Sequence, residues 1–169
     1  PKPDDFQIKE AAELIKKSKK PIIIAGGGVF YSDATDELSS FASKHNIPVT
    51  QTVMGYSSIN KDHSHYLGTI GGLGGKAANN LSKETDTAIA VGTKLADFTT
   101  GSWANFENAD FKLVSINAAR FDANKHMAQA VVGDAKVSLI ELSQALGSWK
   151  AEDSWYKQSR TELKNWEAY

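Results

Sequence analysis

Residues 87–103, TAIAVGTKLADFTTGSW, decide the fold class of this chain. An apolar run from Thr87 to Val91 leads directly into Gly92-Thr93 and a polar loop. Such a run is typical of a strand that is buried on both faces of a parallel sheet. Open parallel sheets bind ligands in a crevice beyond the carboxyl ends of their strands. The segment therefore predicts an α/β sheet with a ligand crevice beside Gly92.

The same alternation of apolar runs and helical patterns extends through most of the chain. It favours an α/β fold, a doubly wound and mostly parallel sheet of about six strands with helices on both faces, in the Rossmann-like manner. Strands are predicted near residues 22–25, 48–52, 66–70, 87–92, 111–117 and 130–132. Helices are predicted near residues 6–15, 33–45, 76–84, 134–146 and 151–169.

Three segments are expected along the chain. Residues 1–9 form an N-terminal linker, residues 10–148 form the domain, and residues 149–169 form a helical connector. The connector carries aromatic side chains that include Trp155 and Trp166, and it either packs back on the domain or presents an apolar face to a neighbour.

The turn after the first predicted strand contains three glycines, Gly26 to Gly28. We expect a tight turn there, followed by a helix that Ser32 or Asp33 caps and that ends near His45.

Composition excludes several classes of protein. The chain has 169 residues, 41% of them hydrophobic, and 19 basic against 20 acidic side chains give a net charge of -1. That balance argues against binding to nucleic acid or to an anionic membrane surface. There is no cysteine, no apolar run near the ~20 residues of a membrane span, and no apolar signal segment at the N-terminus. These features predict a cytoplasmic protein.

Two glycine-rich stretches resemble nucleotide-binding motifs only in part. The first, Gly26 to Gly28, lacks the G-x-G-x-x-G spacing, and Gln51 and Thr52 stand where a nicotinamide site needs an acidic residue. The second, GGLGGKA, has Ala77 where a phosphate loop needs Ser or Thr to bind magnesium. A tight turn explains the first stretch equally well, and an anion nest or a flexible turn explains the second.

The histidines do not predict a metal site. His63 and His65 stand two apart in a polar loop, fewer ligands than a metal needs, and we expect them in solvent. His45 and His126 are also expected at the surface. No G-x-S-x-G motif supports a hydrolytic triad, and Trp103 is predicted to anchor a core or an interface.

Six segments nevertheless follow one another as in the middle domain of thiamine-diphosphate (ThDP) enzymes. The resemblance spans about residues 10–147, and the runs GTKLADFTTGSW and SINAARFDANKH are most similar to the family's hydrolases of a cyclic dione in myo-inositol catabolism. Acetohydroxyacid synthases have a similar layout. The six segments are IIIAGGGV, IPVTQTVMGYSSI, HYLGTIGGLGGKAANNL, TDTAIAVGTKLADFTTGSW, KLVSINAARFDANKH and AVVGDAK.

This resemblance implies an enzyme of three α/β domains. The first domain supplies a glutamate that activates ThDP, and the third holds the diphosphate through magnesium with a Gly-Asp-Gly motif and an Asn. Here Ala135 follows Gly133-Asp134, so the resemblance implies that this chain is not catalytic alone. The implied partners are the other two domains, further copies in a homo-oligomer, and the cyclic dione, whose ring the parent enzyme opens to 5-deoxyglucuronate. Residues 55–66 and 99–103 are candidates for one wall of that site.

In acetohydroxyacid synthases the middle domain holds FAD along its glycine turns. An acidic residue common in FAD binders is replaced by Asn117 and an arginine-rich loop by LADFTT, and both departures argue against FAD. A FAD-containing carboligase, a stand-alone module for ADP-like ligands and a purely structural domain remain as alternatives. The positions that match the cofactor-binding turns are Gly27, Gly28, Gly71, Gly92, Thr93, Asn117, Gly133 and Asp134.

Overall fold

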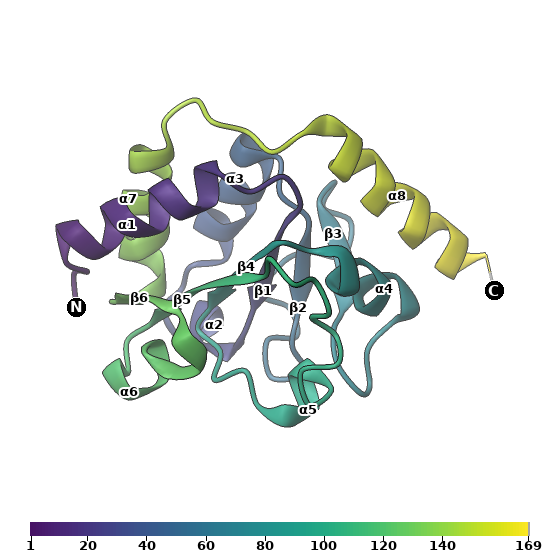
Figure 1. Ribbon diagram of the computed structural model, residues 1–169, viewed down its shortest axis with the longest axis horizontal. Helices are drawn as coiled ribbons and strands as arrows, with labels where there is room; N and C mark the ends of the chain where they lie inside the picture. Colours follow the sequence, from purple (N-terminus) through teal and green to yellow (C-terminus); the bar gives the residue numbers. More distant parts are fainter. Residues whose placement is uncertain (169) are drawn as a thin grey trace.

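The computed structural model describes residues 1–168 and forms a six-stranded sheet with helices on both faces (Figure 1). The strand order is β3-β2-β1-β4-β5-β6, and every neighbouring pair is parallel. This confirms the predicted doubly wound fold. The strands are β1 (Pro21–Ala25), β2 (Val49–Gln51), β3 (Tyr66–Thr69), β4 (Thr87–Val91), β5 (Lys112–Asn117) and β6 (Gln129–Val132).

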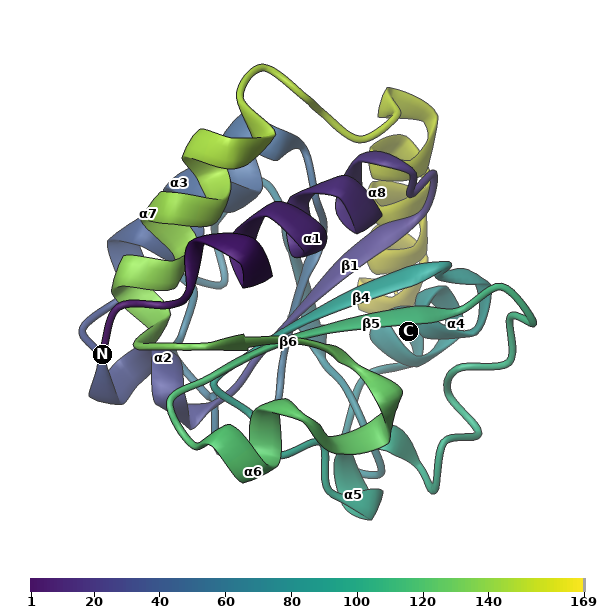
Figure 2. The ribbon, with the colours of Figure 1, turned by 60° about the vertical axis from the view of Figure 1, so that its left-hand side comes forward.

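The helices form two layers around the sheet (Figures 1 and 2). Helices α1, α3 and α7 bury apolar side chains on one face, and α4 and α8 bury theirs on the other. Three short helices, α2, α5 and α6, were not predicted because four or five residues do not show a helical period. The helices are α1 (Asp5–Lys16), α2 (Gly27–Tyr31), α3 (Thr35–His45), α4 (Lys76–Glu84), α5 (Asp97–Thr100), α6 (Arg120–Ala123), the 3₁₀ helix η1 (Lys125–Met127), α7 (Ala135–Leu146) and α8 (Asp153–Glu167).

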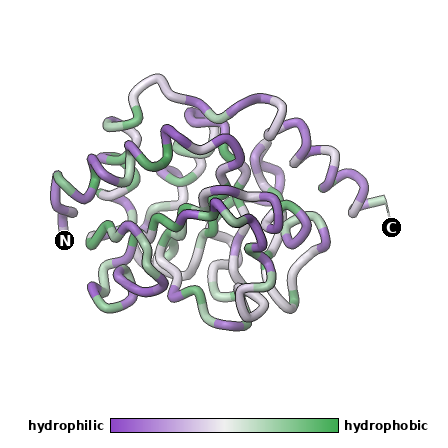
Figure 3. The backbone as a smooth tube through the Cα atoms, viewed as in Figure 1, coloured by the Kyte–Doolittle hydropathy of each residue, from purple (hydrophilic) through white to green (hydrophobic). Residues whose placement is uncertain are grey.

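The sequence of β1 is continuously apolar because the strand is covered on both faces of the sheet. Ile23 and Ala25 join the core beneath α1, α3 and α7, while Ile22 and Ile24 join the core beneath α4 and α8. Successive side chains of a strand point to opposite faces, so a strand covered on both sides has no polar face. Hydrophobic segments, green in Figure 3, lie at the centre of the molecule, where Figure 1 shows the strands of the sheet.

The predicted cap of α3 is wrong. The segment Gly27–Tyr31 is itself helical, and the Ser32 N–H donates to the Gly28 carbonyl at 3.0 Å, so Ser32 ends α2. Asp33 then turns with φ +50°, and α3 begins at Thr35 without a side-chain cap. The glycines therefore open a short helix where a simple turn was expected.

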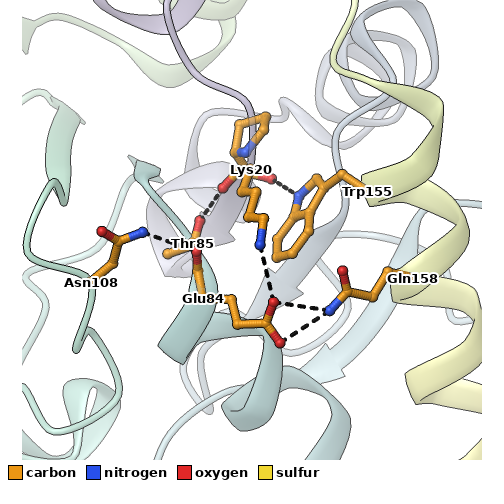
Figure 4. A network of polar contacts seen from close by, with 7 residues as sticks. Lys20, Glu84, Thr85, Asn108, Trp155 and Gln158 are labelled. Atoms are coloured by element: carbon orange, nitrogen blue, oxygen red, sulfur yellow. Dashed lines mark hydrogen bonds and ion pairs between the residues drawn. The ribbon is translucent and has the colours of Figure 1, made fainter.

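The C-terminal helix α8 packs back on the domain, one of the two predicted alternatives. Trp155 is 2% exposed, and its indole Nε1–H donates to the Pro21 carbonyl at 2.7 Å. Glu84 of α4 accepts from Lys20 Nζ at 3.2 Å and from Gln158 Nε2 at 3.1 Å (Figure 4). The segment predicted as a connector thus contains a helix that is fixed to the sheet.

Terminal segments also cover both edge strands. Just before β3, the Tyr156 hydroxyl donates to the Ser64 carbonyl at 2.9 Å, and the Arg160 guanidinium donates to the carbonyl of Tyr66, the first residue of β3. On β6, the Val132 N–H donates to the Gln7 side chain at 2.9 Å. Unpaired edge groups invite pairing with other chains, and these contacts occupy part of each edge. Residues 1–9, predicted as a linker, include the first turn of α1 and this edge contact.

Two histidines lie inside the protein, against expectation. His45 is fully buried, with Nδ1 2.8 Å from the Trp149 carbonyl and Nε2 2.8 Å from the Ser143 hydroxyl. His65 is 7% exposed, between Asn46 Oδ1 at 2.9 Å and the Ser64 hydroxyl at 2.9 Å. Burial lowers the pKa of both rings, that of His65 to about 4. The polar residues around His45 and His65 in the sequence had predicted exposed side chains. In the folded chain, α7 covers His45 and α8 covers His65, and both helices lie far along the sequence.

Candidate functional site

A crevice of about 660 Å³ opens at the carboxyl ends of β1, β2, β4, β5 and β6. It lies where the strand order reverses between β1 and β4, the position where open α/β sheets bind ligands. Strands β1, β2, β4 and β6 contribute residues that follow their last position, and β5 also contributes its last two residues, Ile116 and Asn117. The prediction of a crevice beside Gly92 is confirmed as a feature of the structure.

Within the crevice lining, the first turn of α2 contacts the loop that follows β4. The Gly28 N–H donates to the Gly92 carbonyl at 2.9 Å. A Cβ atom on Gly28 would lie 2.6 Å from the Gly92 Cα, and Gly92 also has φ +62°. Carbon atoms pack at ~3.5–4.0 Å, so neither position accommodates a side chain. The backbone contact between α2 and the loop after β4 is by itself enough to require glycine at both positions.

The Asn117 side chain joins the loop after β4 to the loop after β5. Its Nδ2 donates to the Thr93 carbonyl at 3.3 Å, and its Oδ1 accepts from the Ala119 N–H at 2.9 Å. Both ends of the amide are thereby engaged with the protein backbone. Asn117 therefore helps to shape the crevice by joining the loops after β4 and β5.

The structure brings together six of the eight predicted cofactor-binding residues. Gly71 lies elsewhere, where its N–H and carbonyl each bond to the Asn79 side chain at 3.0 Å. Asp134 caps α7, and its carboxylate accepts from the Val137 N–H at 3.2 Å. The six that line the crevice are Gly27, Gly28, Gly92, Thr93, Asn117 and Gly133.

Asp134 remains ionised as a helix cap. Burial opposes its charge, but hydrogen bonds from Ser32 and from the amides of Val137 and Lys136 prevail and lower its pKa. Its oxygens thus satisfy the first turn of α7. Among residues 1–168 no three His, Asp or Glu side chains gather as metal ligands.

Large exposed apolar side chains form the rim of the crevice. Tyr31 at the end of α2 is 84% exposed, Met54 in the loop after β2 is 80% exposed, and Phe98 in α5 is 54% exposed. They were not predicted from the sequence, because Tyr31 and Phe98 lie in helices too short to show a helical period. Of the charged lining residues, Asp122 pairs with Lys125 at 2.7 Å. Exposed apolar groups of this kind fit docking of a ligand or a protein surface.

The two predicted wall segments take different positions. Thr99 lines the crevice. Trp103 instead packs against the core beneath α4 and α8, and the centroid of its ring lies 4.6 Å from that of the His126 ring. His126 lies at the surface, as predicted. Val53 and Met54 reach the crevice from the loop after β2, whereas residues 56–61 line a second crevice beside it.

Fold and crevice together define a doubly wound α/β domain with a ligand or docking site at its switch point. Residues 8–142 match the family described as "Thiamine pyrophosphate enzyme, central domain". The chain belongs to this family and forms its central domain. Thiamine pyrophosphate is another name for ThDP, so the predicted family is confirmed.

Similar proteins from several bacteria are named 3D-(3,5/4)-trihydroxycyclohexane-1,2-dione hydrolase. The protein from Clostridium perfringens is 41% identical over 95% of this chain and 25% of its own length. A Bacillus cereus protein, numbered 2, is 39% identical over 98% of the chain and 26% of its own length. One from Bacillus anthracis is 42% identical over 85% and 22%. The chain thus spans about a quarter of the length of these relatives.

Proposed function

We propose that this chain is the central domain of a ThDP-dependent hydrolase that opens a trihydroxycyclohexane-dione ring by cleaving a C–C bond. The observation that carries the proposal is the 41% identity to a hydrolase of that name over 95% of the chain. The product would be 5-deoxyglucuronate, in myo-inositol catabolism in the cytoplasm. No helix within residues 1–168 is long and apolar enough to cross a membrane.

The residues of this domain act by binding and positioning. ThDP, when bound, supplies the carbanion chemistry of the parent enzyme. The family's third domain holds the diphosphate of ThDP through magnesium, with a Gly-Asp-Gly motif and an Asn. This chain does not match that motif, because Ala135 follows Gly133-Asp134, and the Asp134 carboxylate caps α7. ThDP and magnesium are therefore assigned to parts of the longer chain outside this domain. The central domain would supply the scaffold and subunit contacts.

The exposed rim of the crevice supports a docking role. Tyr31, Met54 and Phe98 gather large apolar surfaces at one end of the sheet, and such groups are usually covered by a partner. The proposed partners are the other two domains of the same chain and further copies in a homo-oligomer.

The experiment is an assay of the intact parent protein with the cyclic dione. Ring opening that needs added ThDP and magnesium, by a preparation without flavin absorbance, supports the proposal. Formation of a carboligation product by a yellow, FAD-containing preparation would overturn it in favour of an acetohydroxyacid-synthase-like enzyme. This 169-residue chain alone should show no turnover. A parent that neither opens the ring nor ligates would also refute the proposal.

A further inference from the structure

The glycine-rich turn that lies between β3 and α4, residues 71–75, is fixed by hydrogen bonds. Its first amide donates to Asn79 Oδ1 at 3.0 Å, and its second donates to the Phe98 carbonyl at 3.0 Å. Four of its five amides donate to protein acceptors, namely those of Gly71, Gly72, Gly74 and Gly75. A turn with bonded amides does not offer a nest of free N–H groups to an anion. What it presents outward is therefore its side chains.

Three large apolar side chains meet at this turn and stay exposed. Leu73 in the turn is 73% exposed, Phe98 in α5 54%, and Trp166 near the end of α8 44%. A Cβ atom on Gly72 would lie 3.2 Å from the Phe98 ring. A Cβ atom on Gly75 would lie 3.2 Å from the indole nitrogen of Trp166. Glycine at both positions therefore lets each ring lie against the backbone of the turn, and the three side chains form one surface, the turn patch.

The turn patch has the composition of a protein interface. Aromatic side chains are enriched and charged ones depleted at interface centres, and residues 71–75 carry no charged side chain. Asn105 adds rigidity, since its Nδ2 donates to Asn79 Oδ1 at 3.2 Å and so joins the segment after α5 to α4. A surface that is already rigid loses less conformational freedom when a partner binds. These features fit an apolar protein surface as the partner.

The course of α8 indicates which partner covers the turn patch. Trp155, near the start of α8, bonds to Pro21 at the start of β1, whereas Trp166 lies against the turn after β3. Helix α8 thus carries the chain from the amino end of the sheet to its carboxyl end, beside α4 (Figure 1). The family is a central domain, and most of the length of the relatives lies outside the matched part. A tethered segment beside its docking surface has an effective concentration in the ~millimolar range.

We propose that the turn patch docks the domain that follows α8 in the parent chain. The occupant is part of the same polypeptide, and its apolar surface covers Leu73, Phe98 and Trp166. The proposal rests on the docking role in the proposed function and narrows it to one partner and one surface. It does not rest on the ring-opening reaction. Phe98 also borders the switch-point crevice, but Leu73 and Trp166 lie outside the crevice lining.

The test is a photo-crosslink in the intact parent protein that carries Leu73→benzoylphenylalanine. Illumination should join position 73 to a peptide beyond residue 169, and the product should keep the mass of one chain on a denaturing gel. A product with the mass of two chains would assign the patch to a second copy and overturn the proposal. Attachment before residue 1 or only within residues 1–168 would overturn it, as would the absence of a product. Ile140, 43% exposed on α7, is the matched control position, and the same product from there would also overturn it.

Leu73→Asp in the parent tests the energetic role of the patch. The side chain is exposed in this domain, so the domain should fold, while a charge buried in an apolar interface opposes docking. Limited subtilisin digestion should cleave the chain after α8 about tenfold faster, since cleavage follows the population of the open form. Ile140→Asp should leave that rate unchanged, and a wild-type rate in Leu73→Asp would refute the docking.

Ring opening measured in the same preparations separates the two proposals. A parent that gives the expected crosslink but opens no ring refutes the proposed reaction and supports the docking. An active parent without the crosslink refutes the docking alone.

Discussion

Gly92→Ala tests whether the contact between α2 and the loop after β4, and not a bound ligand, requires glycine in the crevice lining. The added Cβ would lie 2.6 Å from the Gly28 Cα and 2.9 Å from its carbonyl carbon, about 1 Å inside a normal contact. The two segments would have to separate and strain the Gly28 N–H to Gly92 carbonyl bond of 2.9 Å. Overpacking of this kind costs about 1–3 kcal/mol. The left-handed backbone at φ +62° adds about 1–2 kcal/mol. The variant should therefore lose about 2–5 kcal/mol of unfolding free energy.

Gly101→Ala is the matched control for this prediction. Gly101 has φ +58°, but a Cβ there would meet nothing closer than 3.4 Å, so only the backbone term of about 1–2 kcal/mol applies. Urea unfolding of both variants, followed by far-ultraviolet circular dichroism, measures the difference. Equal losses would refute the packing argument and return Gly92 to a role in ligand approach.

Three further predictions concern stability. His65 has a pKa of about 4 in the folded chain against 6.5 without the fold, which corresponds to roughly 3 kcal/mol. The folded state holds this ring neutral, so the contribution is complete above pH 6.5 and declines as the pH falls toward 4. Urea unfolding at several pH values should show a smaller decline in His65→Gln, and an unchanged pH dependence would contradict the assignment. Trp155→Ala should cost about 3–5 kcal/mol, since it empties a buried site and leaves the Pro21 carbonyl unpaired. Trp166→Ala, at 44% exposure, should cost less than about 1 kcal/mol in the same thermal unfolding experiment, and similar losses would argue against the anchoring role. Asp134→Ala should cost about 1 kcal/mol by removing the cap of α7, while Asp134→Asn should retain most of it; equal losses would exclude the cap.

Much of the fold followed from short-range patterns. All six strands were predicted, and the clearest signals were continuous apolar runs such as those of β1 and β4, since a strand covered on both faces has no solvent-facing side. Residues 76–84 were predicted as a helix with the bounds that α4 has. The order of six short segments correctly indicated the central domain of ThDP enzymes. Local chemistry suffices for these features, since neighbouring residues decide them.

Tertiary structure alone decided which residues meet and which are covered. His45 and His65 stand in polar sequence, yet their partners include Ser143, Trp149 and Tyr156, about a hundred residues away. The sequence determined that Gly92 ends a strand at a crevice, but only the folded chain shows that Gly28 occupies the space beside it. A strand or helix is specified by its own period. The close approach of α2 to the loop after β4 depends on how the sheet orders its strands, which no local pattern encodes.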